Sequence, residues 1–421
     1  MEAVRYKDEL QQEAQEKMQE ERAAWEKKLE EGAKELEEDI LKDRRHIHRN
    51  PEVGDELPEP YEYVTERLKQ MGYEPRRCAR YGILAEAGQG EKMFLLRADM
   101  DALPMAEESG LPFASPYPDR AHTCGHDTHV AMLLGAAKML KENESELKGR
   151  VRLMFQPNEE GLFGAVDMIA DHALDGVDAA MALHIDATMP LGYLTRGQGC
   201  AFASNDFFDI VITGKGGHAA RPADAVDPIN VMSYIQMGIQ TLISREGTPT
   251  ETNVISITSV EAGGGAYNII PDTAVMRGTL RTYNEKQRCL LKKRLEEMVK
   301  ATAAAFRAQA EVRYLSDGIP ALRCNIAMSD QLKQYANELL GENYVAEEPF
   351  QKVGSEDFAH VCERIPGGYF FLGAGPDEHS VWPYGQHNPR VLHNESVLYK
   401  GAAVEAQCAA RWLEDAAAEG R

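Results

Sequence analysis

The sequence lacks any long apolar run, which bears on whether a membrane is a partner. The best candidate, Val130–Leu140, is shorter than the roughly 18 residues that a membrane helix needs, and it contains Lys138. Charged residues begin at Glu2, so no apolar segment precedes a cleavage site as it would in a signal peptide. We therefore expect no membrane partner.

Cysteines are few, and basic residues are outnumbered by acidic ones. The seven cysteines are scattered and odd in number, so they do not form a disulfide framework, and a reducing cytoplasm is the expected location. The 421 residues include 68 acidic and 46 basic side chains, a formal net charge of −22. Because nucleic acids attract clustered Lys and Arg, we expect no nucleic-acid partner.

Several catalytic motifs are missing as well. The chain has no Gly-x-x-x-x-Gly-Lys-Ser/Thr loop, no Gly-x-Ser-x-Gly elbow and no His-Glu-x-x-His helix. A partial dinucleotide fingerprint spans Gly214–Ala219, but Pro222 and Pro228 interrupt the helix that nucleotide binding requires. This excludes a nucleotide site there and leaves His218, in the same loop, without an evident structural duty.

The chain is long enough for two or three domains of about 150 residues each. Residues 1–42 are rich in Glu and Lys and predict a charged N-terminal helix. Its apolar stripe is too short and irregular for several heptads, which favours packing on the protein over a coiled-coil partner helix. We predict a catalytic domain at 43–197 and 316–421, with a lid or dimerisation domain inserted at 198–315.

The periodicity predicts mixed α/β structure in the catalytic domain and a smaller α+β insertion. In the catalytic domain we predict strands at 82–87, 93–98, 151–155 and 178–184, and helices at 61–71, 128–140 and 329–340. In the insertion we predict strands at 206–213, 253–260, 273–281 and 311–315, and helices at 228–244 and 285–307. The β-α-β-β-α-β order of the insertion is that of a ferredoxin-like sandwich. The predicted fold class is therefore an α/β catalytic domain with a central mixed sheet, interrupted by a ferredoxin-like α+β domain.

Metal-binding residue types crowd the segment His122–His129. Cys124 and His126 form a Cys-x-His step, beside Asp127. Thiolate and imidazole suit Zn²⁺, and imidazole with carboxylate suits Mn²⁺ or Ni²⁺. A zinc finger would need a second Cys/His pair at short spacing, and none follows; a buried free cysteine would not explain the neighbouring residues. The segment therefore indicates a metal site.

Three further candidates follow. Glu159 and Glu160 come after an apolar strand; on an extended strand end they would point to opposite sides, so that one binds metal while the other takes a proton from water. The alternative is an ordinary exposed pair. His184 ends an apolar strand, where a satisfied core histidine is the commoner role. His387 lies in an irregular loop, where a surface histidine is the alternative.

Five motifs together make the chain resemble the M20 metallopeptidase family, in particular its amidohydrolases of N-acyl amino acids, such as hippurate, auxin-conjugate and aminobenzoyl-glutamate hydrolases. The motifs are Arg97–Pro104, His122–Asp127, Phe155–Gly161, Gly214–Ala219 and Gly354–Phe358. The similarity extends from about Arg44 to about Trp412. Two segments depart from the family pattern, Arg390–Asn394 and Glu378–Tyr384.

The resemblance implies a site with two divalent ions, Mn²⁺, Zn²⁺, Ni²⁺ or Co²⁺. The positions that match the family's metal ligands are Cys124, His126, Glu160, His184 and His387. Glu159 matches the general base, and Asp101 a residue that orients the site. His218 matches a histidine that serves the partner subunit's site, and Asn268 and Arg281 match positions near the substrate. A homodimer through the inserted domain is implied as well.

The predicted function is hydrolysis of the amide bond of N-acyl or N-aroyl amino acids, which releases a carboxylic acid and a free amino acid. Metal-activated water would attack the amide, with Glu159 as general base. The substrate partner would be a small N-acyl amino acid. Two alternatives remain: a dipeptidase or aminopeptidase of the same fold, and a non-catalytic scaffold on this fold.

Overall fold

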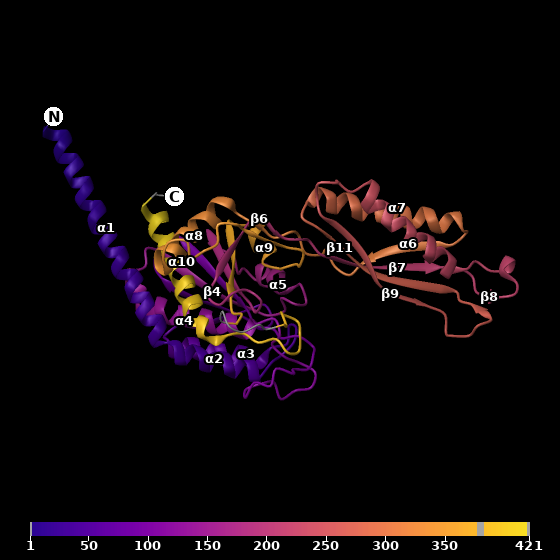
Figure 1. Ribbon diagram of the computed structural model, residues 1–421, viewed down its shortest axis with the longest axis horizontal. Coiled ribbons are helices and arrows are strands. Elements are labelled where there is room, and N and C mark those ends of the chain that lie inside the picture. Colours follow the sequence, from indigo (N-terminus) through magenta and orange to yellow (C-terminus); the bar gives the residue numbers. More distant parts are fainter. Residues whose placement is uncertain (1, 377–382, 419–421) are drawn as a thin grey trace. The chain divides into compact units, whose positions relative to one another are not determined.

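The computed structural model describes residues 2–376 and 383–418, and these form two compact units (Figure 1). Unit 1 comprises Met1–Gly199, Cys324–Phe350 and Val361–Arg421, and unit 2 comprises Cys200–Arg323 and Gln351–His360. Residues 316–323 and 351–360, which the sequence analysis assigned to the catalytic domain, therefore group with unit 2. None of the helices in the described residues is both long and apolar enough to cross a membrane.

Unit 1 is built on a mixed sheet with the strand order β1-β2-β4-β3-β5-β15-β6. The strands are β1 Arg76–Cys78, β2 Gly82–Gly88, β3 Met93–Asp99, β4 Arg150–Gln156, β5 Ala179–Asp186, β6 Leu194–Phe202 and β15 Gly367–Gly373. The four central strands β4, β3, β5 and β15 are parallel, whereas β2 and β6 run antiparallel to their neighbours. Two short strands, β13 Arg323–Cys324 and β14 Phe350–Lys352, occur where the chain passes between the units.

The register of the central strands gathers their carboxyl ends at one edge of the sheet. Asp99, the last residue of β3, is paired with Gln156, the last residue of β4. Ligand sites in open α/β sheets form at this edge, outside the carboxyl ends of parallel strands. The loops that follow β3 and β4 therefore leave the sheet where a site is expected.

Helices cover this sheet and complete the core of unit 1. α4 (His126–Glu142) and α10 (Leu398–Ala418) pack beside each other and against β3, and α2 (Glu37–Arg49) packs on α4. The other helices of unit 1 are α3 Pro58–Gln70, α5 Gly164–Ala170 and α8 Ile326–Leu340, and the short α9 Ala359–Cys362 lies at a unit boundary. Nearly every residue of α4 is buried, because the helix is covered on both sides.

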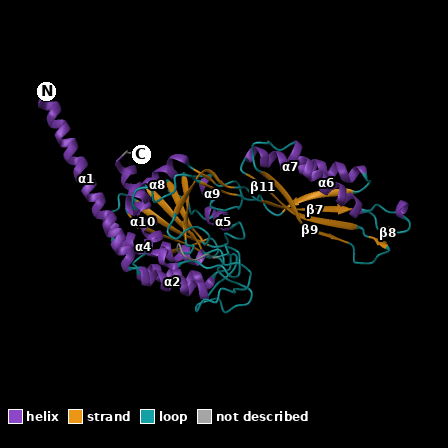
Figure 2. Cartoon of the chain, viewed as in Figure 1, coloured by secondary structure: helices purple, strands orange, loops and turns teal. Residues whose placement is uncertain are grey.

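The N-terminal segment is helical, as Figure 2 shows. α1 runs from Glu2 to Glu35, and α2 follows after Leu36, so the predicted boundary at residue 42 falls inside α2. Leu29 and Ala33 are fully buried in the core of unit 1, and Arg22 pairs with Glu414 of α10 at 3.0 Å. Part of α1 thus packs on the protein by one apolar stripe.

Unit 2 is an antiparallel sheet of order β12-β7-β11-β9 with two helices. The strands are β7 Asp206–Thr213, β9 Asn253–Ala262, β11 Thr273–Thr282 and β12 Gln309–Tyr314, the helices are α6 Pro228–Arg245 and α7 Glu285–Ala305, and β8 Gly217–His218 pairs with β10 Ile269–Ile270 as a separate small sheet. The apolar faces of α6 and α7 share one core with the sheet. The order along the chain is β-α-β-β-α-β, so the predicted α/β fold with an inserted α+β domain is confirmed.

Candidate metal centre

Cys124 and His126 are brought together by the turn that starts α4. Gly125 lies between them with φ +107°, in the left-handed region where residues with a side chain are strained. A Cβ atom at this position would lie 2.6 Å from Ile185 Cγ2. The glycine therefore allows the sharp entry into the helix that sets both donors beside the ends of the strands.

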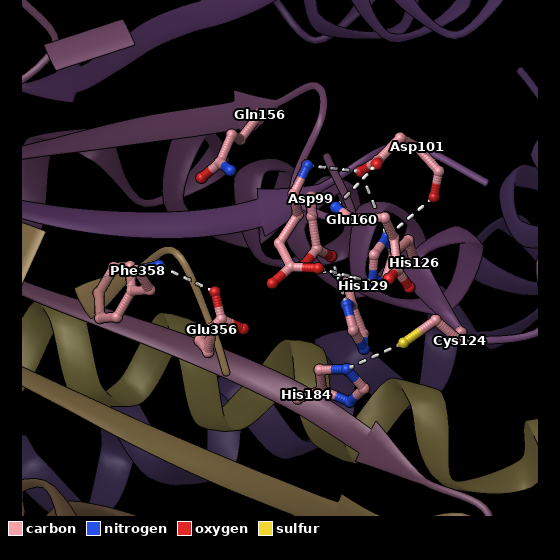
Figure 3. A network of polar contacts seen from close by, with 12 residues as sticks. Asp99, Asp101, Cys124, His126, His129, Gln156, Glu160, His184, Glu356 and Phe358 are labelled. Carbon is pink, nitrogen blue, oxygen red and sulfur yellow. Dashed lines mark hydrogen bonds and ion pairs between the residues drawn. The ribbon is translucent and has the colours of Figure 1, made fainter. Parts of the chain in front are cut away.

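A first group of donors joins this turn to β5. The ligand atoms of Cys124, His126 and His184 lie within 4.8 Å of one another, and Figure 3 shows Cys124 and His184 joined by a dashed line, with Sγ 3.5 Å from Nε2. The Nδ1 atom of His126 is 2.8 Å from the carbonyl oxygen of Asp101. The Nδ1 atom of His184 is 2.6 Å from the carbonyl oxygen of Ile185. These contacts turn both Nε2 atoms toward the centre of the group, as at metal sites.

A second group shares the cysteine. The donor atoms of Cys124, Glu160 and His387 also lie within 4.8 Å of one another, and His387 Nε2 is 3.1 Å from Glu160 Oε1. The side chain of His387 is 54% exposed, so this group opens to solvent. The structure therefore brings all five predicted ligands together around one thiol.

The two adjacent glutamates are held in a turn, which differs from the extended strand end that we expected. β4 ends at Gln156, and Asn158 has φ +60°, so the chain has left the extended conformation before Glu159. Asp101 fixes the turn, because its Oδ1 and Oδ2 atoms accept the backbone N–H groups of Glu159 and Glu160 at 3.0 and 3.1 Å. Oε2 of Glu159 lies 4.0 Å from Nε2 of His126.

His129 lies close to these donors but both of its ring nitrogens are engaged. Nδ1 is 2.5 Å from Oδ1 of Asp99, and Nε2 accepts the backbone N–H of Ile185 at 2.9 Å. A histidine ligand needs one nitrogen free for the ion. His129 therefore fixes Asp99 and the end of β5, although Asp99, His126 and His129 are close enough to form a group of their own.

The electrostatics of the centre favour a cation. Burial alone would lower the pKa of His126, but Asp99 and Cys124 outweigh it and raise that pKa well above its ordinary value. Hydrogen bonds to Cys124 and Glu160 raise the pKa of His387 to about 10. Burial lowers the pKa of His184, which keeps that imidazole neutral and able to bind metal. Buried acidic groups thus stabilise positive charge at this point.

The donor set fits a pair of divalent ions. Bonds of about 2.0–2.3 Å from a tetrahedral ion place its donors about 3–4 Å from one another, which agrees with the 3.5 Å between Cys124 and His184 and the 3.1 Å between His387 and Glu160. Nε2 of His126 is buried and has no hydrogen-bond partner in the described residues. Such an atom is costly unless it is coordinated. Thiolate, imidazole and carboxylate are ligands that Zn²⁺, Mn²⁺, Ni²⁺ and Co²⁺ accept.

The remaining predicted residues lie in unit 2. His218 and Asn268 are exposed and adjacent: β8 pairs with β10, and the backbone N–H of Ala219 donates to the carbonyl of Asn268 at 3.0 Å. Arg281 lies on β11, and its Nη1 atom donates to the carbonyl of Val353 at 3.2 Å. Burial lowers the pKa of Arg281. Within unit 2, these side chains do not form a cluster comparable to that around Cys124.

The sequence analysis did not identify the supporting residues. Asp99 was included only as part of the motif Arg97–Pro104, and it contacts His129 and Arg97. His48 contacts Asp127 but was not singled out. The available signal would have been the spacing of Arg44 and His48. Two basic side chains four residues apart lie on one face of a helix, where an acidic side chain such as Asp127 can contact both. Most of the departing segment Glu378–Tyr384 lies outside the described residues.

Comparison with known proteins agrees with this geometry. A model of Peptidase family M20/M25/M40 matches residues 95–411. An IAA-amino acid hydrolase ILR1-like 4 of Arabidopsis thaliana is 39% identical over 376 residues, 88% of this chain and 84% of the relative. An N-acetyl-L-cysteine deacetylase of Bacillus subtilis is 36% identical, over 90% of this chain and 89% of the relative.

Among solved structures, the Bacillus subtilis YXEP protein, described as a dinuclear metal binding peptidase, has a TM-score of 0.77 and 31% identity, over 90% of this chain and 99% of that one. The fold and the donor set define a metal-dependent hydrolase of amide or peptide bonds. The family model covers well over half of the sequence, so the chain belongs to Peptidase family M20/M25/M40.

Proposed function

We propose that the protein hydrolyses the amide bond of N-acyl or N-aroyl amino acids, releasing a carboxylic acid and a free amino acid. The observation that carries this proposal is the convergence of four candidate metal ligands on a fifth, Cys124, with Glu159 beside them. The names of two relatives, an IAA-amino acid hydrolase and an N-acetyl-L-cysteine deacetylase, support an acylated amino acid as the substrate class.

We propose that the five side chains hold two divalent ions, with Cys124 shared between the two groups. One ion would take His126 and His184, and the other Glu160 and His387. The ions, when bound, would lower the pKa of a water molecule and polarise the scissile carbonyl. The native metal could be Mn²⁺, Zn²⁺, Ni²⁺ or Co²⁺, since the donors suit each of them.

Glu159 would act as the general base. It accepts a proton from the attacking water and delivers it to the leaving nitrogen, so that the amine departs neutral. Asp101 supports this role because it holds the backbone of both glutamates and, through its carbonyl, His126. We therefore assign Asp101 as the residue that orients the site.

The residues of unit 2 are assigned from the family resemblance. We propose that the protein is a homodimer through unit 2, in which His218 of one copy donates to the substrate carbonyl oxygen at the centre of the other copy. Asn268 and Arg281 would bind the substrate, the latter through its carboxylate. We also propose a cytoplasmic location, which is consistent with the seven free cysteines.

A panel of acylated amino acids, offered to protein loaded separately with Zn²⁺, Mn²⁺ and Co²⁺, tests the activity. Glu159→Gln should lower turnover by roughly 10²–10⁴-fold, because a general base contributes that much, while bound metal measured by elemental analysis stays at the wild-type level. The matched control is Glu91→Gln, an exposed glutamate of the same unit. Turnover within threefold of wild type in Glu159→Gln would refute the base assignment.

A peptidase remains the second candidate, because the family and the YXEP protein are described as peptidases. The two functions differ in the acyl side of the scissile amide: in an N-acyl amino acid it comes from a simple carboxylic acid, and in a peptide it is an aminoacyl group with a free amine. A free dipeptide and its N-acetyl amino acid counterpart, compared at equal concentration, distinguish them. Preference for the dipeptide would replace our proposal.

A further inference from the structure

A second cluster of charged side chains lies beside the proposed ligands, and the proposed reaction does not use it. It consists of Arg44, His48, Glu107, Asp127 and Glu395, all in unit 1. Arg44, His48 and Asp127 are 1%, 3% and 0% exposed. Burying such groups costs on the order of several kcal/mol per ion, which partners offset only with good geometry. The cluster therefore needs a reason beyond stability.

Asp127 attaches this cluster to the helix that carries His126. Its Oδ2 atom accepts hydrogen bonds from Arg44 Nε at 2.9 Å and from His48 Nδ1 at 2.8 Å. Successive side chains on a helix are about 100° apart, so Asp127 faces α2 while His126 faces Asp101. The negative charge is also favourable in the first turn of a helix. α2 thus holds the first turn of α4 on a different side from the metal ligand.

His48 links this turn to a second carboxylate. Its other ring nitrogen, Nε2, is 3.0 Å from Oε1 of Glu107. Burial alone would lower the pKa of His48, but Asp127 and Glu107 outweigh it and raise the pKa to about 9. His48 is therefore a cation at neutral pH, and each ring nitrogen donates to one carboxylate.

Glu107 closes the loop that follows β3. Its Oε2 atom accepts the backbone N–H of Ser115 at 2.7 Å, and the hydroxyl of Ser109 also donates to its Oε1. The side chain of Glu107 is 3% exposed. The carboxylate thus holds together a loop that has no helix or strand of its own between residues 105 and 115.

This loop in turn holds the segment that carries His387. The backbone N–H of Glu108 donates to the carbonyl of Pro389 at 2.6 Å. His387 has φ +64°, a left-handed conformation that costs a residue with a side chain about 1–3 kcal/mol and persists only where the surroundings hold it. The ion pair of Arg44 Nη1 with Glu395 Oε1, at 2.9 Å, is a second contact, between α2 and the chain that follows His387.

We propose that Glu107, His48 and Asp127 are positioning residues of the metal centre. They connect the first turn of α4, which carries His126, to the loop that fixes the backbone at His387. The two ligands belong to different donor groups, so the chain of hydrogen bonds sets the distance between the two ion positions. This inference rests on the two-ion site of the proposed function and adds the residues that keep the two groups of ligands at a fixed distance.

The test compares Glu107→Gln with Glu56→Gln in the full-length protein. Glu56 is an exposed glutamate that pairs with Arg80 in the same unit. Free Zn²⁺ is set with a competing chelator, and bound metal is measured by elemental analysis. In Glu107→Gln one of the two ions should bind up to about 10-fold more weakly, the lower end of the loss seen when a direct partner of a metal ligand is removed, because Glu107 acts through His48 and Asp127. Glu56→Gln should match wild type.

Thermal unfolding of the metal-free proteins separates positioning from stability. A purely structural role would lower the unfolding temperature of metal-free Glu107→Gln and leave both affinities unchanged, which would overturn the inference. Equal weakening in Glu56→Gln would also overturn it. If Glu107→Gln is insoluble, Ser109→Ala, which removes one donor to Glu107, should weaken the same ion about 2–5-fold, and unchanged affinity would again contradict us. Failure of wild type to bind two ions would instead refute the proposed function.

Discussion

The two units of the chain hold their candidate residues in opposite ways. In unit 1 the donors around Cys124 range from buried His126 to exposed His387, and His126 and His184 each use one ring nitrogen to contact a backbone carbonyl. In unit 2, His218 and Asn268 are exposed. The donors of unit 1 are positioned by contacts within that unit, whereas no comparable set of side-chain contacts holds His218 and Asn268 in the described residues of unit 2. Unit 1 therefore contains a preorganised cluster of donors, and the candidate residues of unit 2 form no such cluster.

The largest effects should separate the two kinds of residue. Cys124→Ala removes the donor common to both groups, so we expect loss of bound metal. Turnover should fall by about 10⁴-fold or more, because the general base then has no metal-activated water to deprotonate. His218→Ala should leave metal content unchanged and lower turnover by about 10²–10³-fold, the usual cost of one donor to a developing oxyanion. Elemental analysis and initial rates measure both.

The same two variants, Cys124→Ala and His218→Ala, could also contradict these assignments. Unchanged metal stoichiometry in Cys124→Ala would remove the thiolate from the ligand set. Loss of metal in His218→Ala would mean that the exposed histidine belongs to the centre after all. Thr241, exposed on α6 of unit 2, offers a control, because Thr241→Ala should change neither quantity.

The difference between the units also explains what the sequence could predict of the fold. The four long strands and both helices of unit 2 were predicted with small errors at their ends, because one face of each is buried and the periodicity is visible along the sequence; the two-residue strands β8 and β10 were missed. β15 (Gly367–Gly373) and β6 (Leu194–Phe202) were missed. Their sequences, rich in glycine or in polar residues, carry no alternation, and their partners lie far away in the chain.

The site shows the same limit. The Cys-x-His step and the glutamate pair were visible because their members are adjacent in sequence. His184 and His387 looked like ordinary histidines, and only the family resemblance joined them to the set, since contacts between distant segments leave no local pattern. The partners of Asp127 were missed for the same reason: Arg44 and His48 lie about 80 residues earlier in the sequence, just after the predicted N-terminal helix.

Core substitutions should lower the stability of one unit and not that of the other. Leu133 on α4 and Leu295 on α7 are both fully buried, each in the core of its own unit. Either change to Ala should cost about 4 kcal/mol of unfolding free energy in that unit. Trp25 and Trp412 lie in unit 1, and the residues of unit 2 include no tryptophan. Tryptophan fluorescence therefore reports unit 1, and circular dichroism reports both.

In urea, Leu295→Ala should leave the midpoint of the fluorescence transition unchanged and shift the unit 2 part of the dichroism transition to lower urea concentration. Leu133→Ala should instead lower the midpoint of the fluorescence transition. A fluorescence midpoint that moves equally in both variants would show that the units unfold as one cooperative body, and the contrast drawn above would then not extend to stability.

The smallest effect concerns the charge on His48. Its pKa in the folded protein is raised to about 9 because Asp127 and Glu107 outweigh the effect of burial. The stability that this gives is fully present below the unfolded pKa of about 6.5 and is lost as the pH rises through 9, by at most about 3 kcal/mol. Wild type should therefore lose more unfolding free energy than His48→Gln between pH 6.5 and 9.5 when fluorescence is followed.

The unit 2 part of the dichroism transition is the internal reference, because it should be equal in the two proteins at each pH. Parallel pH profiles of the fluorescence midpoint would mean that His48 is neutral in the folded state, and the charged link between α4 and the loop after β3 would lose its basis.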